Sequence, residues 1–163
     1  MPQLDELSDS RALISWNDVC AALDEIVAKS QRSIDVFDAT LALQAWGSKA
    51  RCELLSRAMI ERKVRVRMLV VNAEFARREL PRLINLLATL GHQLTVMQAA
   101  EGVEPTANFV VADQQHLLFR PNSVQSRGAV IFNNPYKSMT YSRSFEVVWQ
   151  QGGERLFPEA FGL

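Results

Sequence analysis

The chain has 163 residues, of which 48% are hydrophobic and 22% are charged, and its formal net charge is zero. This length is that of one domain, and the composition is ordinary for a globular protein, which excludes disorder over most of the chain. A dedicated nucleic-acid-binding protein normally carries a basic surplus, so nucleic acid is not expected as a partner.

The first segment is interpreted as a leader. We expect residues 1–12 to be flexible and a single domain to occupy residues 13–163. The leader is acidic and lacks the basic and then apolar pattern of a signal peptide. No apolar run in the chain approaches the ~18 residues that a membrane span requires. The sequence therefore favours a cytoplasmic protein without a membrane anchor.

The first half of the domain alternates helices with strands. A helix is predicted from Ser15, because Ser15 and Asp18 have the spacing of a capping box. A short strand follows at 33–38 and a second helix at 48–62. The segment 64–71 begins in alternation and ends fully apolar, as a strand that enters the interior of a sheet does.

The second half contains a run of strands. Pro81 divides the next helical stretch, so we expect a short helix and then a helix at 81–90, with Gly91 in the left-handed position after it. Asn134-Pro135 is interpreted as a turn, and the last helix is expected at 142–151. Strands are predicted at 93–97, 108–113, 116–120 and 128–133.

This order predicts an α/β fold with a mixed, mostly parallel sheet and helices on both faces. The early alternation is typical of parallel strands covered by helices. The strands 108–113 and 116–120 are separated by two residues, which is typical of an antiparallel hairpin. Cys20 and Cys52 both fall in predicted helices and show no metal-ligand spacing, so we expect reduced thiols, no metal and no cofactor.

The segment Thr106–Asp113 (TANFVVAD) resembles the motif of the phospholipase D superfamily, which is His-x-Lys-x-x-x-x-Asp on a core strand. The spacing, the apolar filling and the final Asp agree, and a second strand follows at once, as it does in that family. The resemblance covers roughly residues 15–155 and implies one half of a two-motif enzyme. It is closest to small bacterial domains of unknown function, some of which have relatives fused to acetyltransferases.

Two departures from the motif decide the chemistry that the resemblance implies. In active members the His attacks phosphorus and the Lys stabilises the phosphoryl charge. Here Thr106 stands at the His position and Asn108 at the Lys position, and only Asp113 is retained. The glycine-containing phosphate loop is also absent, and its region reads RPNS at 120–123. The resemblance therefore implies a pseudoenzyme with degenerate positions at Thr106, Asn108 and Asp113.

Five residues are candidates for residual anion binding. Arg120 can supply a charge and Ser123 a hydroxyl, in addition to the amide of Asn108. Arg65 and Arg67 alternate along one predicted strand and therefore share a face. They either bind a phosphate or pair with acids on a covering helix, and we favour the ion pairs.

Asp113 and His116 flank the predicted hairpin turn. An Asp at a strand end can accept hydrogen bonds from following backbone amides, and we favour this structural role for Asp113. The alternative is an Asp113–His116 pair that acts as a base and its orienting group. No activated nucleophile is obvious near that pair in the sequence.

The favoured function is a catalytically inactive domain that serves as a binding, regulatory or dimerisation module. The resemblance implies a homodimer, because single-motif members of the superfamily often pair two halves about a two-fold axis; a partner protein is the alternative. Two other functions stay open. One is a phosphodiesterase or nuclease with an altered active site, and the other is a module that binds phosphoanions or nucleic acid through its arginines.

Overall fold

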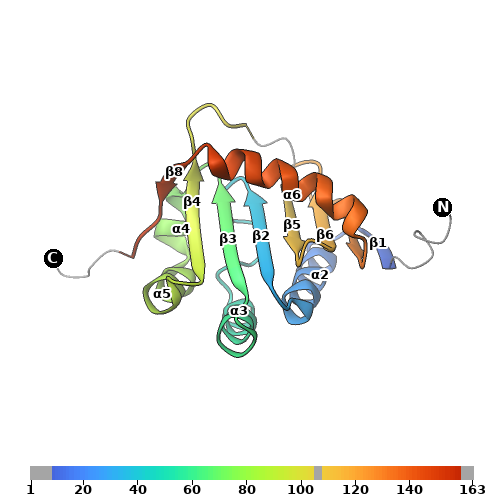
Figure 1. Ribbon diagram of the computed structural model, residues 1–163, viewed down its shortest axis with the longest axis horizontal. Helices are drawn as coiled ribbons and strands as arrows, with labels where there is room; N and C mark the ends of the chain where they lie inside the picture. Colours follow the sequence, from blue (N-terminus) through green and yellow to red (C-terminus); the bar gives the residue numbers. More distant parts are fainter. Residues whose placement is uncertain (1–8, 105–107, 159–163) are drawn as a thin grey trace.

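The computed structural model describes residues 9–104 and 108–158. Its centre is an eight-stranded sheet in the order β1-β7-β6-β5-β2-β3-β4-β8 (Figure 1). The strands are β1 Asp9–Leu13, β2 Ser33–Asp38, β3 Arg65–Val70, β4 Leu94–Ala99, β5 Asn108–Ala112, β6 His116–Arg120, β7 Gly128–Phe132 and β8 Gly153–Arg155. The helices are α2 Trp16–Lys29, α3 Lys49–Arg62, α4 Glu74–Glu79, α5 Pro81–Leu90 and α6 Pro135–Gln150.

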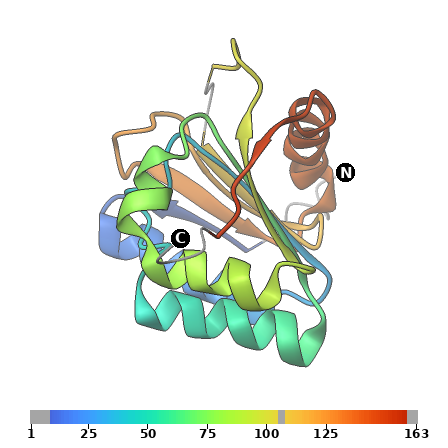
Figure 2. The same ribbon diagram turned by 90° about the vertical axis from the view of Figure 1, so that its left-hand side faces the viewer.

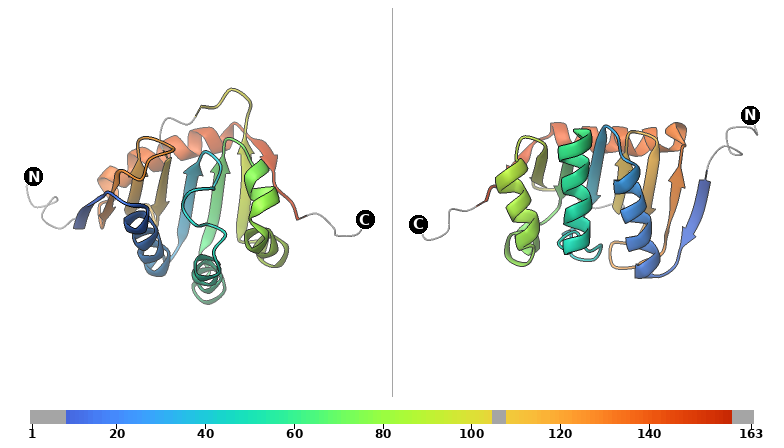
Figure 3. Two further views of the ribbon diagram at one scale, coloured as in Figure 1. Left: turned by 180° about the vertical axis from the view of Figure 1, so that it is seen from behind. Right: turned by 90° about the horizontal axis from the view of Figure 1, so that it is seen from below.

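Helices cover both faces of the sheet. α2, α3 and α5 lie on one face, and α6 crosses the other (Figures 2 and 3). Because successive strand residues point to opposite faces, each strand supplies both layers with apolar side chains. In β2, Val36 belongs to the core beneath α2, α3 and α5, and Phe37 belongs to the core beneath α6. The predicted α/β class with helices on both faces is confirmed.

The sheet is mixed, as predicted, but its parallel part is smaller than expected. β2 pairs with β3 and β3 with β4 in parallel, whereas the other five pairings are antiparallel. The early alternation of helices and strands produces the parallel part. The described residues between β4 and β5 form no helix, and β5, β6 and β7 add to the other edge of β2 as an antiparallel meander.

Both edge strands differ from the sequence-based expectation. Residues 9–12, which we assigned to the flexible leader, form β1 together with Leu13 and pair with β7. β8 pairs with β4 in a segment where no strand was expected. Residues 1–8 of the predicted leader lie outside the described residues.

The ends of three helices test the predictions made from capping residues. The capping box of Ser15 and Asp18 is present at the start of α2. The last helix begins at Pro135 and not at residue 142, because Asn134 caps it and Pro135 occupies its first turn. Gly91 has φ −61°, so the predicted left-handed residue after α5 is wrong. No helix in the described part of the chain is long and apolar enough to cross a membrane.

Candidate functional site

Asn108, at the position of the motif Lys, is buried beside the end of β2. β5 runs antiparallel to β2, with Phe109 opposite Phe37, so Asn108 lies next to the carboxyl end of that strand. Its Oδ1 accepts a hydrogen bond of 3.0 Å from the backbone N–H of Ala39. Its Nδ2 has no hydrogen-bond partner among the described residues. A neutral amide, held by the β2–α3 connection, thus occupies the place of a cationic group.

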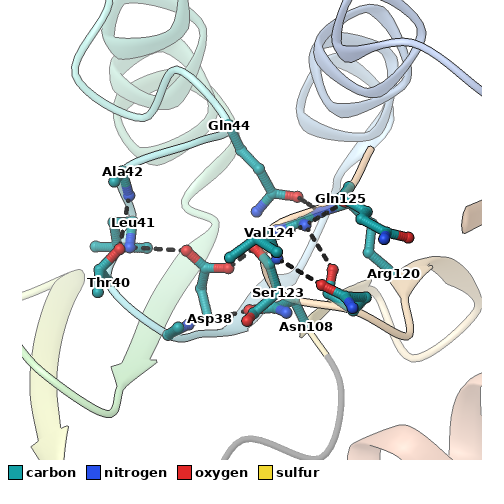
Figure 4. A network of polar contacts seen from close by, with 12 residues as sticks. Asp38, Thr40, Leu41, Ala42, Gln44, Asn108, Arg120, Ser123, Val124 and Gln125 are labelled. Carbon is teal, nitrogen blue, oxygen red and sulfur yellow. Dashed lines mark hydrogen bonds and ion pairs between the residues drawn. The ribbon is translucent and has the colours of Figure 1, made fainter. Parts of the chain in front are cut away.

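Arg120, at the end of β6, is fully buried at the same end of the sheet. Its Nε donates to Oε1 of Gln44 at 3.1 Å, and its Nη2 lies 3.3 Å from Oδ1 of Asp38 (Figure 4). Nη1 donates to the carbonyl oxygens of residues 122, 123 and 125. The guanidinium also lies 4.9 Å from the ring centroid of Trp16. All three nitrogens of Arg120 are therefore engaged by the protein itself.

Asp38 completes this group, which we call the Arg120 cluster: Asp38, Gln44, Asn108 and Arg120. Oδ2 of Asp38 accepts a hydrogen bond of 2.7 Å from the backbone N–H of Leu41. Burial raises the pKa of Asp38, against the opposing effects of the Leu41 amide and the charge of Arg120. Burial also disfavours the charged form of Arg120 and therefore lowers the pKa of its guanidinium. The ion pair is desolvated. Asp38 holds the β2–α3 connection through Leu41, and Arg120 holds the loop after β6 through the carbonyl oxygens of that loop.

Asp113 lies at the opposite end of β5, about 17 Å along the strand from Asn108. Its carboxylate accepts backbone hydrogen bonds from Gln31 at 2.9 Å, Arg32 at 2.7 Å and Ser33 at 3.0 Å. The predicted structural role therefore fits the geometry, but the donors precede β2 in the sequence and do not follow Asp113. The residue has a φ of 55°, a left-handed conformation that Asp tolerates better than most residues.

Arg67 forms the ion pairs that the strand pattern favoured. It contacts Asp35 through two hydrogen bonds, of 2.9 and 3.1 Å, and it also pairs with Glu146 on the covering helix α6. Its guanidinium lies 4.9 Å from the ring centroid of Phe145. The bond to Arg67 lowers the pKa of Glu146. Arg67 is thus an anchor for α6, with its Nε and Nη2 engaged by two carboxylates.

The five predicted anion-binding residues do not form one site. Asn108, Arg120 and Ser123 lie at one end of the sheet, but Ser123 contributes its backbone carbonyl to Arg120. Arg67 lies beneath α6, and Arg65 is exposed at the far end, opposite Ser33 of β2. Thr106, the position of the motif His, lies outside the described residues.

His116 has no hydrogen bond to Asp113 among the described residues. Its Nδ1 accepts a hydrogen bond of 3.1 Å from the backbone N–H of Asn133, and its ring packs against Phe132. Burial lowers the pKa of His116, because the charged imidazolium loses its hydration. The arrangement fits a neutral imidazole that stabilises the end of β7, and it does not provide the base and orienting pair considered from the sequence.

Sequence reasoning missed two members of the Arg120 cluster. Asp38 ends a predicted apolar strand, and an acidic residue at that place was the available signal. Gln44 lies in an irregular connection and has no sequence signal. Cys20 and Cys52 are free thiols, and no group of three or more His, Cys, Asp or Glu residues in the described ranges could hold a metal ion.

A family model and several solved structures match the chain. The model of DUF7931, a domain of unknown function, matches residues 15–156. No curated protein sequence matches. Nuc from Salmonella typhimurium, a phospholipase D family member, is 13% identical with a TM-score of 0.68, and the match covers 90% of this chain and 97% of Nuc.

Two further structures extend the comparison. NucT from Helicobacter pylori is 6% identical with a TM-score of 0.56, and the match covers 90% of this chain and 99% of NucT. TrmBL2, an archaeal chromatin protein with a mode of DNA binding of its own, is 12% identical with a TM-score of 0.68. That match covers 91% of this chain, which spans 55% of the length of TrmBL2. These likenesses confirm the phospholipase D-like fold.

Proposed function

We propose a function from the premise that the chain belongs to the DUF7931 family and has a phospholipase D-like fold. In this proposal, the chain is a catalytically inactive domain that works as a binding or regulatory module. One observation carries this proposal: the position of the motif Lys holds a neutral, buried Asn108, and the neighbouring Arg120 has every guanidinium nitrogen engaged. A phosphoryl group at that end of the sheet would receive no free positive charge from either residue.

The test is hydrolysis of an activated phosphodiester by the full chain. With bis(4-nitrophenyl) phosphate, we expect no release of nitrophenolate above the buffer rate, because Thr106 lacks the basic nitrogen of a histidine nucleophile. Turnover that disappears in both Asp113→Ala and His116→Ala would refute inactivity. A third variant, Arg57→Gln on α3, controls for contaminating enzymes, since their activity would be the same in all three preparations.

The second candidate is a phosphodiesterase or nuclease with an altered active site. The fold likeness to Nuc over nearly its whole length favours it, and the same hydrolysis assay decides between the two. The likeness to TrmBL2 also makes DNA a candidate ligand, against the expectation from the zero net charge. DNA binding that falls steeply with salt concentration would support this role.

We further propose that the module is a homodimer, as the resemblance to single-motif members implies. Light scattering at micromolar concentration should give twice the chain mass of 18.3 kDa. A strictly monomeric chain would contradict this assembly and leave a separate partner protein as the ligand of the module.

A further inference from the structure

A groove lies at the end of the sheet opposite the Arg120 cluster. It has a volume of about 790 Å³ and runs between α6 and the β5–β6 turn. Arg32 and Gln114 line its sheet side, and Met139, Ser142, Arg143 and Val147 line its helix side. A second hollow of about 360 Å³, lined by Arg65 among others, shares Arg32 and Gln114 with it. We call the two together the α6 groove.

Positive charge is available in this groove. The guanidinium groups of Arg32, Arg65 and Arg143 are exposed, and no hydrogen bond or ion pair joins them to another described residue. The two carboxylates in the walls are already engaged. Asp113 accepts three backbone amides, and Glu146 pairs with Arg67. Arg32 and Arg143 therefore have no ion-pair partner within the described part of the protein, whereas Arg65 interacts with the carboxylate of Glu146 through charge alone.

The helix side of the groove is apolar. Met139 and Val147 keep 45% and 62% of their surface exposed. Between them lies Ser142, which is nine-tenths buried and whose Oγ has no hydrogen-bond partner among the described residues. A cavity of this size, with apolar walls and a few polar groups, is typical of small-molecule sites. The arginines and the apolar side chains of α6 line the same groove, so a ligand that fits it has both a negative charge and an apolar portion.

We propose that the α6 groove binds a small organic anion with an apolar body, a carboxylate or phosphate on an alkyl or aryl group. The anion lies against Arg32, Arg65 and Arg143, since planar guanidinium groups bind such oxygens in pairs. The apolar body lies along Met139 and Val147. The proposal does not rest on catalytic inactivity, because its contacts are made by Arg32, Arg65 and Arg143 and the motif position Asn108 lies at the opposite end of β5. Asp113, the motif residue that lines the groove, has its carboxylate engaged by backbone amides.

The test is calorimetric titration of the full chain with octyl phosphate below its micellar concentration. We expect saturable binding of one molecule, weakened roughly ten-fold by Arg32→Gln or Arg143→Gln, as the loss of a charge-assisted hydrogen bond implies. Arg57→Gln, an exposed arginine on the other face of the sheet, should leave the affinity unchanged. Nonanoate in place of octyl phosphate identifies the preferred anionic group.

Three results would overturn the proposal. Octanol that binds as tightly as octyl phosphate, or arginine variants with unchanged affinity, would show that the groove selects no anion. If octyl phosphate does not bind and Val147→Asp reduces the mass of the assembly in light scattering, the groove is a contact between two copies of the chain and not a ligand site.

Discussion

Replacing Arg120 with methionine is expected to lower the free energy of unfolding by about 3–5 kcal/mol, because breaking a buried ion pair leaves a charge uncompensated. The carboxylate of Asp38 would stay buried, with backbone amides such as that of Leu41 as its remaining donors. Gln44 Oε1 and three backbone carbonyls would lose their donor as well. Methionine keeps much of the aliphatic stem, so the experiment removes charge and hydrogen bonds rather than volume. Urea denaturation at pH 7 measures the change.

Two further variants separate the causes of this loss. Arg82→Met on α5 removes an exposed arginine and should change stability by less than about 0.5 kcal/mol. The double variant Arg120→Met, Asp38→Leu should recover part of the loss, since it removes the unpaired carboxylate but leaves the carbonyls unsatisfied. If Arg120→Met alone changes stability no more than Arg82→Met does, the buried cluster does not hold this end of the sheet.

The loss should also depend on pH. Burial already raises the pKa of Asp38, and removing Arg120 takes away an interaction that lowers it. In the variant, the carboxyl therefore takes up a proton in the folded state more readily than in the unfolded chain. A raised folded-state pKa favours folding below it, so the variant should approach the wild-type protein in stability as the pH falls from 7 toward 5.

Local signals predicted the elements whose ends are determined by neighbours in the sequence. The hydroxyl of Ser15 and the carboxylate of Asp18 are three residues apart, and the capping box needs only these two groups. Pro81 removes a backbone donor and therefore separates α4 from α5 wherever the rest of the chain lies. The alternation and apolar end of β3 likewise identify a strand within a sheet, without information on its neighbours.

The missed elements depend on contacts that no short segment contains. All three residues of β8 are exposed, so the strand has no burial pattern and exists because its backbone pairs with β4. The start of α6 was missed for another reason: Asn-Pro is as good a helix start as a turn, with Asn134 as the cap and Pro135 in the first turn. The sequence signal was present but allowed both structures.

The candidate site shows the same limit. An arginine at a strand end is ordinarily exposed, and the sequence near Arg120 gives no reason for burial. Its partners Asp38 and Gln44 are 82 and 76 residues away in the sequence. The departures from the resembled motif at Thr106 and Asn108 could be read from the sequence. The contacts of Arg120 with Asp38 and Gln44 could be identified only from the fold.

Replacing Asp113 should have the second largest effect, and it tests the only motif residue that is retained. Asp113→Ala removes the acceptor for the backbone amides of Gln31, Arg32 and Ser33. We expect a loss of about 2–3 kcal/mol: charge-assisted hydrogen bonds are worth more than neutral ones, but water can reach the exposed amides and replace part of them. Alanine also bears a penalty of about 1 kcal/mol at the left-handed φ of 55°.

Two matched variants divide the effect of Asp113→Ala into its parts. Asp113→Gly removes the same hydrogen bonds without the left-handed penalty, so it should be about 0.5–1 kcal/mol more stable than the alanine variant. Asp113→Asn keeps Oδ1, which accepts from all three amides, and it tolerates the same φ; its loss should stay below about 1 kcal/mol. Denaturation midpoints measured together under one set of conditions give the three differences. If Asp113→Asn loses as much stability as Asp113→Ala, the fold requires the negative charge of Asp113 and not only an acceptor oxygen. The exposed arginines of the α6 groove would then be the groups to test as partners of that charge.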